Sequence, residues 1–203
     1  MFSFSDREQT LAQLQASVAP TTTSPFGATS GANDISGTGS ANVIFALGGN
    51  DTVSARGGGD VVLGMGGKDV LFGNGGKDTL EGGGGKDTLN GNSGRDELSG
   101  DNGCDFLDGG CGRDTLDGGK GRDEQTGGGG ADVFQFGCGD GKNTITDFRQ
   151  RQDRIEIEEQ DDLFAALDSI IQRGDDGLIT FANVQITILD QDAGDLTLAD
   201  FII

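Results

Sequence analysis

Large apolar residues recur every nine positions through the middle of the chain. They occupy nine of ten consecutive places, and the remaining place holds Gln125. The nine are Val53, Val62, Leu71, Leu80, Leu89, Leu98, Leu107, Leu116 and Phe134. Their neighbours, as in Thr79-Leu80-Glu81, give a polar–apolar–polar alternation that is typical of a short, half-buried strand. The pattern predicts one short strand in every nine residues, with a degenerate unit around Ile44 before the series.

Aspartate and glycine keep the same period. An aspartate stands two positions before each of the ten places, at Asp51, Asp60, Asp69, Asp78, Asp87, Asp96, Asp105, Asp114, Asp123 and Asp132. A glycine stands two positions before each aspartate, at Gly49, Gly58, Gly67, Gly76, Gly85, Gly94, Gly103, Gly112, Gly121 and Gly130. A segment of the form G-x-x-G-x-D cannot form a helix, and its glycines allow turns with positive φ. Each unit is therefore predicted to be a turn followed by a strand.

A turn and a strand repeated in this way must form a coil. Two units per coil give a rung of about 18 residues, with parallel strands on two sides and apolar residues in a thin interior. We therefore expect an all-β fold, a parallel β-roll of about ten to eleven nonapeptide repeats. Stacked rungs lie ~4.8 Å apart. The aspartates then form two ladders, with Asp51, Asp69, Asp87, Asp105 and Asp123 along one edge and Asp60, Asp78, Asp96, Asp114 and Asp132 along the other.

Composition and charge exclude several classes of function. The chain has 203 residues, of which 34 are acidic and 14 basic, for a formal net charge of −20. This balance argues against a nucleic-acid binder, because phosphate contacts need clustered Lys and Arg. The lack of histidine excludes Ser-His-Asp triads and histidine-ligated zinc. No apolar run approaches the ~20 residues that a membrane-spanning helix needs. Since only 33% of residues are hydrophobic, something besides a large core must stabilise the fold.

Two ladders of closely spaced carboxylates need counter-ions, because like charges at this spacing repel. Calcium suits such turns, since it accepts six to eight oxygens in flexible geometry from carboxylates and from backbone carbonyls. Magnesium prefers a smaller and more rigid octahedron. We therefore expect the ten aspartates to be metal ligands, together with backbone carbonyls of turn residues such as the ten glycines. Four gaps along each edge predict about eight calcium ions.

The units at 64–72 and 82–90 resemble the RTX (haemolysin-type) nonapeptide G-G-x-G-x-D-x-U-x. The resemblance covers about residues 31–140. It implies a right-handed parallel β-roll in a protein exported through a type I channel, with calcium held by the sixth-position aspartate of each unit. The sequence departs from the family pattern at Ala46 and Ala55 in the first position, at several second positions that lack glycine, and at Gln125 in a core position.

The segments before and after the repeats lack the nine-residue period. Residues 1–30 are expected to hold one helix, at 5–18, and a linker. Residues 141–203 are expected to form a β-rich cap, because a solenoid must close its open end. Alternating segments at 144–148, 154–158, 178–181 and 184–189 predict strands of this cap. A short helix is expected from Asp162, with Ile171 on its apolar face and Gly174 as its stop.

The C-terminal part also resembles that of serralysin-type secreted proteases. The resemblance lies in Asp132-Val133-Phe134, in Asp147-Phe148, in Asp153-Arg154-Ile155 and in the tail at 198–203. It implies that the C-terminus is a type I secretion signal and that the export machinery is a partner. The N-terminus, Met1 to Asp6, lacks the pattern of a secretory signal peptide. The three cysteines, Cys104, Cys111 and Cys138, are expected to be free thiols, because the two-edge arrangement keeps them apart.

The leading hypothesis is that the chain is a secreted, extracellular or surface-associated calcium-binding protein whose β-roll folds on extracellular calcium. Its role would be structural or adhesive, without catalysis. One alternative is a polysaccharide-binding module similar to those attached to alginate epimerases. Another is a non-catalytic relative of serralysin-type proteases, since HExxH is absent. An enzyme with a glycosidase-like acidic pair is disfavoured, because calcium would occupy such a pair.

Overall fold

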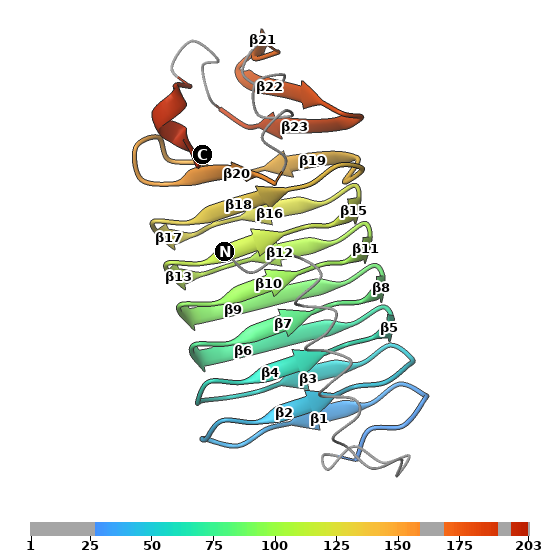
Figure 1. The fold of residues 1–203 in the computed structure, drawn as a ribbon. Coiled ribbons are helices and arrows are strands. Elements are labelled where there is room, and N and C mark those ends of the chain that lie inside the picture. Colours follow the sequence, from blue (N-terminus) through green and yellow to red (C-terminus); the bar gives the residue numbers. More distant parts are fainter. Residues whose placement is uncertain (1–26, 159–168, 191–195, 203) are drawn as a thin grey trace.

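The computed structural model describes residues 27–158, 169–190 and 196–202, and two stacked parallel sheets form its body (Figure 1). The first sheet contains β1 (Asp34–Ser36), β3 (Thr52–Ser54), β6 (Val70–Gly76), β9 (Thr88–Gly94), β12 (Phe106–Asp108), β16 (Glu124–Thr126) and β19 (Lys142–Ile145). The second contains β2 (Val43–Phe45), β4 (Val61–Leu63), β7 (Thr79–Glu81), β10 (Glu97–Ser99), β14 (Thr115–Asp117), β18 (Val133–Phe136) and β20 (Arg154–Ile157). Successive strands of the chain alternate between the sheets, as the nine-residue period predicts.

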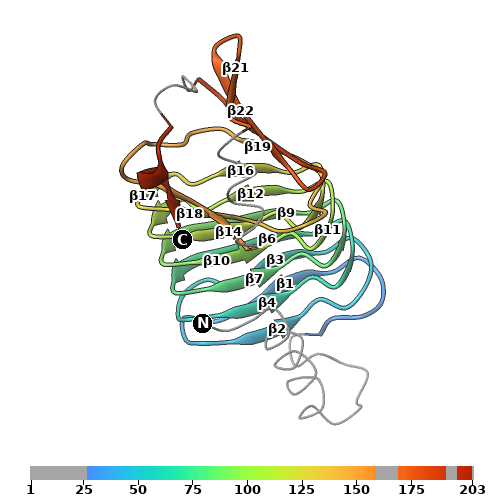
Figure 2. The same ribbon diagram turned by 45° about the horizontal axis from the view of Figure 1, so that its top comes forward.

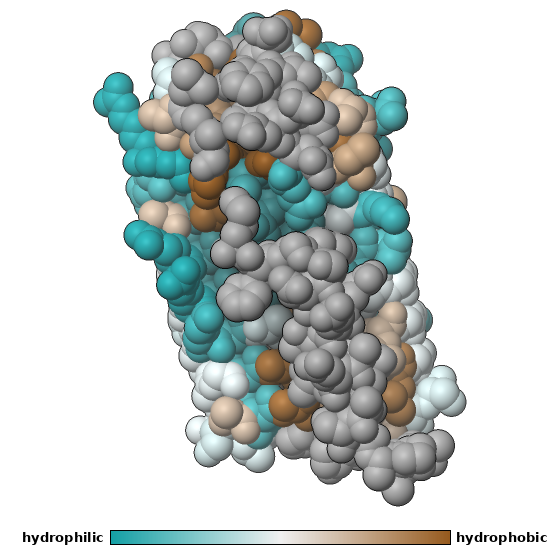
Figure 3. Space-filling model, in the orientation of Figure 1, coloured by the Kyte–Doolittle hydropathy of each residue, from teal (hydrophilic) through white to brown (hydrophobic). Residues whose placement is uncertain are grey.

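The register confirms a rung of two nonapeptides. Val53 pairs with Leu71 in the first sheet, and Val62 pairs with Leu80 in the second, so partners are 18 residues apart. The rungs form a stack of flattened loops, which Figure 2 shows from an oblique angle. Hydrophilic side chains extend along the left-hand edge of the described surface in Figure 3. The fold is the expected all-β, parallel β-roll.

The turns are themselves hydrogen-bonded stacks. Along one edge lies a small parallel sheet of β5 (Gly66–Gly67), β8 (Gly84–Gly85), β11 (Asn102–Gly103) and β15 (Lys120–Gly121). Along the opposite edge, the C-terminal ends of β6 and β9 pair with each other. The end of β9 also pairs with β13 (Cys111–Gly112), which in turn pairs with β17 (Gly129–Gly130). Backbone groups in these glycine-rich turns therefore bond to the turns above and below them.

The core is a thin double stack of inward side chains. In the first sheet the stack contains Ile35, Val53, Leu71, Leu89, Leu107, Gln125 and Ile145, each at most 2% exposed. In the second it contains Ile44, Val62, Leu80, Leu98, Leu116, Phe134 and Ile155, each at most 1% exposed. Each rung thus contributes about two apolar side chains, which is little burial for 18 ordered residues.

After residue 140 the parallel sheets continue through longer loops. β19 pairs with β16 at an offset of 20 residues, from Glu124 to Thr144, and β20 pairs with β18 at an offset of 21 residues, from Val133 to Arg154. Two further strands add to these sheets: β23 (Val184–Ile188) lies parallel to β19, and β24 (Phe201–Ile202) lies parallel to β20. β22 (Asp176–Phe181) and β21 (Ile171–Arg173) complete an antiparallel extension that ends the stack.

The four strands predicted after residue 140 are confirmed as β19, β20, β22 and β23, each within a few residues of its expected bounds. The helix predicted at 5–18 lies outside the described residues, as do residues 162–168 of the second helix. The structure contradicts the end of that second helix, since Ile171 begins β21 and pairs with Leu178. A β-branched residue readily joins a strand when a partner is available. The one helical turn among described residues is the 3₁₀ turn η1 (Leu198–Asp200).

The boundaries 1–30, 31–140 and 141–203 remain predictions. Cys104, Cys111 and Cys138 are free and exposed. Within the described ranges, no helix has the length and apolar content to cross a membrane.

Adjacent glycines of one turn should differ sharply in their tolerance of a side chain. Gly67 has φ of +136°, and a Cβ there would collide with the backbone carbonyl oxygen of Gly49, whereas a Cβ on Gly66 would meet nothing within 4 Å. We expect Gly67→Ala to lower the free energy of unfolding in calcium by about 2 kcal/mol or more, and Gly66→Ala by under about 1 kcal/mol. Denaturant unfolding measures both, and equal losses would contradict the turn geometry.

Candidate metal centre

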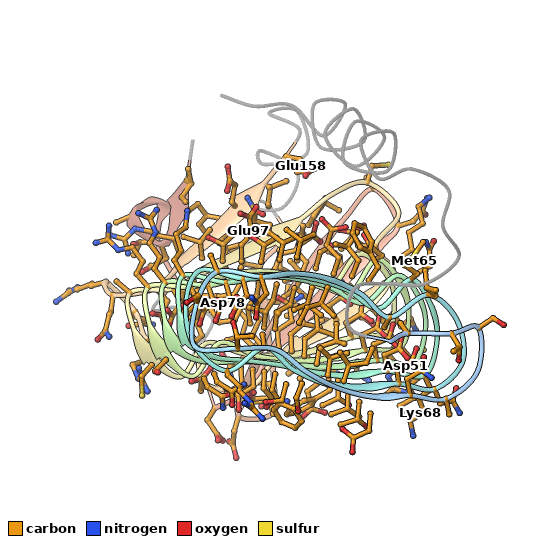
Figure 4. The ribbon with its side chains drawn as sticks, turned by 90° about the horizontal axis from the view of Figure 1, so that it is seen from below. Asp51, Met65, Lys68, Asp78, Glu97 and Glu158 are labelled. Atoms are coloured by element: carbon orange, nitrogen blue, oxygen red, sulfur yellow. The ribbon has the colours of Figure 1, made fainter. Side chains whose placement is uncertain are left out.

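The structure brings the ten predicted aspartates together as two buried ladders. Each is at most 3% exposed, although each carries a carboxyl group. Figure 4 looks along the stack and shows Asp51 and Asp78 inside the flattened loop toward its two ends. Lys68, which immediately precedes an aspartate, points outward in the same view. The carboxyl groups therefore line the inside of both edges, as the two-unit rung predicts.

One oxygen of each carboxyl group accepts a hydrogen bond from the backbone. The Oδ1 atom accepts a hydrogen bond from the backbone N–H of the corresponding residue one turn earlier, at 2.6–3.0 Å. For example, Asp51 N–H donates to Asp69 Oδ1 and Asp69 N–H donates to Asp87 Oδ1, both at 2.8 Å. The aspartates therefore bind successive turns to one another, which explains why the side chain must be short and accept hydrogen bonds.

The second oxygen of each carboxyl group lacks a hydrogen-bond partner among the described residues. The Oδ2 atom of all ten aspartates is buried and has no hydrogen-bond partner among the described residues. A buried anionic oxygen without a donor or a cation is costly, since desolvation of a charge is not compensated. Ten such atoms in one small fold make a repeated structural feature, and each needs a positive partner.

At six turns the Oδ2 atom faces a second oxygen across the first glycine of the repeat. A Cβ built on Gly64 would lie 2.6 Å from Asp69 Oδ2 and 2.6 Å from the carbonyl oxygen of Gly82 in the next turn. The same two kinds of oxygen, at 2.6–2.8 Å and 2.6–3.1 Å, meet the Cβ positions of Gly64, Gly73, Gly82, Gly91, Gly100 and Gly109. We call each of these six places a glycine site. At these six places a Cβ would lie between the two oxygens and too close to both of them.

Two of the eight expected gaps between successive ladder aspartates differ from these six glycine sites. The first position of the repeat is Ala46 before Asp51 and Ala55 before Asp60, and both alanines are 0% exposed. These two turns therefore carry a methyl group at the repeat position where the six glycine sites have none. The eight gaps therefore comprise six with one common arrangement and two that a methyl group alters.

The ladders extend beyond the ten aspartates at both ends. At the start, Asn33 N–H and Asn42 N–H donate to Asp51 Oδ1 and Asp60 Oδ1. At the end, Asp123 N–H donates to Asn143 Oδ1 at 3.1 Å.

Asp132 N–H likewise donates to Asp153 Oδ1, at 3.0 Å. Sequence analysis did not identify Asn33, Asn143 or Asp153 as ladder residues. Asn33 carried a usable signal, since it stands nine residues before Asn42, but the loops before Asn143 and Asp153 break the period.

Burial raises the pKa of the ladder carboxyls and the backbone hydrogen bond lowers it, while a nearby aspartate raises the pKa further for all of them except Asp51 and Asp60. The pKa is raised to about 6 for Asp69, Asp96, Asp105 and Asp132. It is raised to about 7 for Asp114 and Asp123. Without a cation, these groups therefore take up protons close to neutral pH.

The donor set of the ladders is made of oxygen atoms alone. Among the described residues, no three Asp, Glu, Cys or His side chains gather in a group that could hold a metal ion. Backbone carbonyls must therefore supply many of the oxygens at any metal site here. Carboxylate and carbonyl oxygens in a flexible turn are the ligands that calcium prefers.

Comparison with known families identifies the repeats. The family described as RTX calcium-binding nonapeptide repeat (4 copies) matches residues 27–62, 54–89, 63–98, 90–125 and 99–134, which together span more than half of the chain. The chain therefore belongs to the RTX calcium-binding repeat family. No curated protein matches the sequence.

Two solved structures are similar to the chain at low identity. The extracellular lipase LipA from Serratia marcescens is 15% identical over 87% of this chain, with a TM-score of 0.45. The chain spans 39% of the length of that lipase. The AlgE6R3 subunit of the Azotobacter vinelandii mannuronan C5-epimerase is 18% identical, with 91% of this chain and 86% of that chain covered and a TM-score of 0.30.

The raised pKa values predict an unusual dependence of metal-free stability on pH. The ordinary carboxyl pKa is 3.8, so between pH 4 and pH 7 the folded ladder binds more protons than the unfolded chain does. The contribution is fully present below the unfolded pKa and is lost as pH rises through about 6 and 7. In chelator, we expect more β-structure by circular dichroism at pH 4.5 than at pH 7.5. A metal-free protein that gains stability from pH 4.5 to pH 7.5 would contradict the burial of these groups.

Proposed function

We propose that the ten ladder aspartates bind calcium and that the six glycine sites form a set of equivalent calcium sites. The observation that carries this proposal is the buried Oδ2 atom without a donor, placed beside a backbone carbonyl of the next turn. Two oxygen acceptors that converge without a donor are a suitable place for a cation. Membership in the RTX calcium-binding family supports calcium as that cation.

The residues have separate tasks in this proposal. Each Oδ1 stays hydrogen-bonded to the preceding turn, and each Oδ2 is left to meet the ion. The first-position glycine keeps the space open, and its carbonyl supplies an oxygen to the site one turn earlier. Calcium supplies the positive charge that the chain itself does not place there.

Calcium binding is thereby coupled to folding. The unfolded chain has no site that combines a carboxylate of one turn with a carbonyl of the next, so the ion binds the folded state selectively. Each ion at 10 to 100 times its dissociation constant then stabilises the fold by ~1.4–2.7 kcal/mol. Several equivalent sites multiply this term, whereas the core supplies only about two apolar side chains per rung.

The proposed setting is extracellular. Calcium sites in extracellular modules have dissociation constants of ~10⁻⁴–10⁻³ M. Sites of that affinity would stay empty in the cytosol and fill outside the cell, so the chain would pass an export channel unfolded and fold after release. The role that follows is structural or adhesive binding at or near the cell surface, with type I secretion machinery as the partner for export. The proposal assigns no catalytic residue.

A second candidate function is the binding of an acidic polysaccharide. The observation that favours it is a row of exposed cations on successive turns of one edge, formed by Lys77, Arg95 and Arg113. Turns are ~4.8 Å apart, so three charges would lie along about 10 Å. Pulldown with an acidic glycan in calcium tests this candidate function. If the three cations bind the glycan, the triple substitution of Lys77, Arg95 and Arg113 to Gln should abolish capture.

The calcium proposal is tested by comparing two variants that each remove one negative charge. Asp96→Asn lies in the middle of a ladder, whereas Asp34→Asn changes an exposed residue of β1. Asparagine can still accept the Asp78 N–H, but it lacks the anionic second oxygen. We expect Asp96→Asn to bind at least one calcium ion fewer by titration calorimetry and to need more calcium to form β-structure. Asp34→Asn should match the unchanged protein in both measurements.

Equal calcium counts for all three proteins would overturn the assignment of the ladder aspartates. A protein that takes up no calcium at millimolar concentration would overturn the proposed function as a whole.

A further inference from the structure

Gln125 is the one polar residue in the inward stack of the first sheet from Ile35 to Ile145. It pairs with Leu107 on one side and with Ile145 on the other. It is 0% exposed, and neither its amide oxygen nor its amide nitrogen has a hydrogen-bond partner among the described residues. A buried amide without partners costs about 1–3 kcal/mol per unsatisfied group, so a plain core role leaves this residue unexplained.

The amide of Gln125 lies at the end of the ladder of glycine sites. A Cβ built on Gly118 would lie 2.8 Å from Asp123 Oδ2 and 2.9 Å from Gln125 Nε2. Beside the other first-position glycines of this edge, such as Gly100, the polar atom close to the Cβ position besides Oδ2 is the backbone carbonyl oxygen of the next turn. At Gly118 the second polar group beside Oδ2 is therefore the Gln125 amide, whereas at the six glycine sites it is a carbonyl oxygen.

The chain beyond this turn explains why a substitute is needed. The next turn is reached through a loop that changes the offset between paired residues from 18 to 20, as with Gln125 and Ile145. The ladder nevertheless continues, since Asn143 Oδ1 accepts the N–H of Asp123 at 3.1 Å. The gap between the Asp123 turn and the Asn143 turn therefore keeps the carboxyl group and the hydrogen bond of a ladder gap.

The opposite edge shows that this place can be filled without a polar atom. At Asp132, the Cβ position of Gly127 lies 2.7 Å from Oδ2 and 3.0 Å from a ring carbon of Phe134. Phe134 occupies the same position of the repeat as Gln125, two residues after the aspartate. Packing alone is thus satisfied by an apolar side chain, and Gln125 differs by bringing an amide to the Asp123 carboxylate.

We propose that the amide oxygen of Gln125 is a calcium ligand, and that with Asp123 it forms an additional site between the Asp123 turn and the Asn143 turn. The inference rests on the proposed function and extends it to a gap that lies beyond the last pair of aspartates on this edge. Oxygen and nitrogen of a glutamine amide exchange places by a rotation of 180° about the last side-chain bond, and the partners decide which atom faces the site. A side-chain carbonyl has the same ligand chemistry as the backbone carbonyl that it would replace.

The test compares Gln125→Leu with Gln125→Glu in the full chain, using calcium as the probe. Leucine is the residue of the preceding turns, so Gln125→Leu should fold, and we expect it to bind one calcium ion fewer than the unchanged protein in titration calorimetry. Glutamate keeps an oxygen and adds a charge, so Gln125→Glu should keep the number of ions and bind the affected ion about tenfold more tightly. Leu107→Val, at the same position one turn earlier, is the matched control and should leave the number of ions unchanged.

The possible results separate this inference from the proposed function. If the unchanged protein and Gln125→Leu bind the same number of ions with the same affinities, Gln125 is no ligand and the ladder proposal stands. If Gln125→Leu and Leu107→Val both lose an ion, the loss reflects core packing, and the inference is wrong. If the unchanged protein binds no calcium, the proposed function itself fails.

Discussion

The whole structure depends on buried carboxylate oxygens that the chain does not neutralise by itself. Ten aspartates place one oxygen in a hydrogen bond between turns and leave the other buried without a donor among the described residues. The first oxygen holds the stack together, and the second oxygen makes the stack unfavourable unless a cation or a proton arrives. Cohesion and dependence on an ion therefore come from the same side chain.

This constraint accounts for the composition of the repeat. At the six glycine sites, a side chain at the first position would lie between Oδ2 and the carbonyl oxygen of the next turn. A side chain at Gly67 or Gly76 would strike the turn below, and both residues have positive φ. Leucine or valine two residues after the aspartate fills a thin core that contributes modestly. The formal net charge of −20 agrees with a chain that does not neutralise its own buried carboxyl groups.

The sequence predicts the fold and the ladders because every determinant is local and periodic. Asp96, for instance, could be placed beside Asp78 and Asp114 from the 18-residue rung alone. Asn143 and Asp153 could not, since their places depend on loops whose lengths break the period. Ala46 and Gln125 are visible in the sequence as departures, but their meaning depends on where a methyl group or an amide lies relative to Oδ2. The predicted end of the second helix was wrong at Ile171, which lies in a strand, because its pairing with Leu178 depends on residues outside the helical pattern.

Amide hydrogen exchange at neutral pH measures how far the stacking of the turns depends on an ion. The backbone N–H groups of the ladder aspartates donate to the carboxyl oxygens of the next turn, so their protection reports whether the turns are stacked. In millimolar calcium, we expect strong protection across residues 64–132. In chelator, we expect the same peptides to exchange at the rate of an unfolded chain. Equal protection in calcium and in chelator at pH 7.5 would show instead that the carboxylates tolerate burial without an ion and that the stack does not depend on calcium.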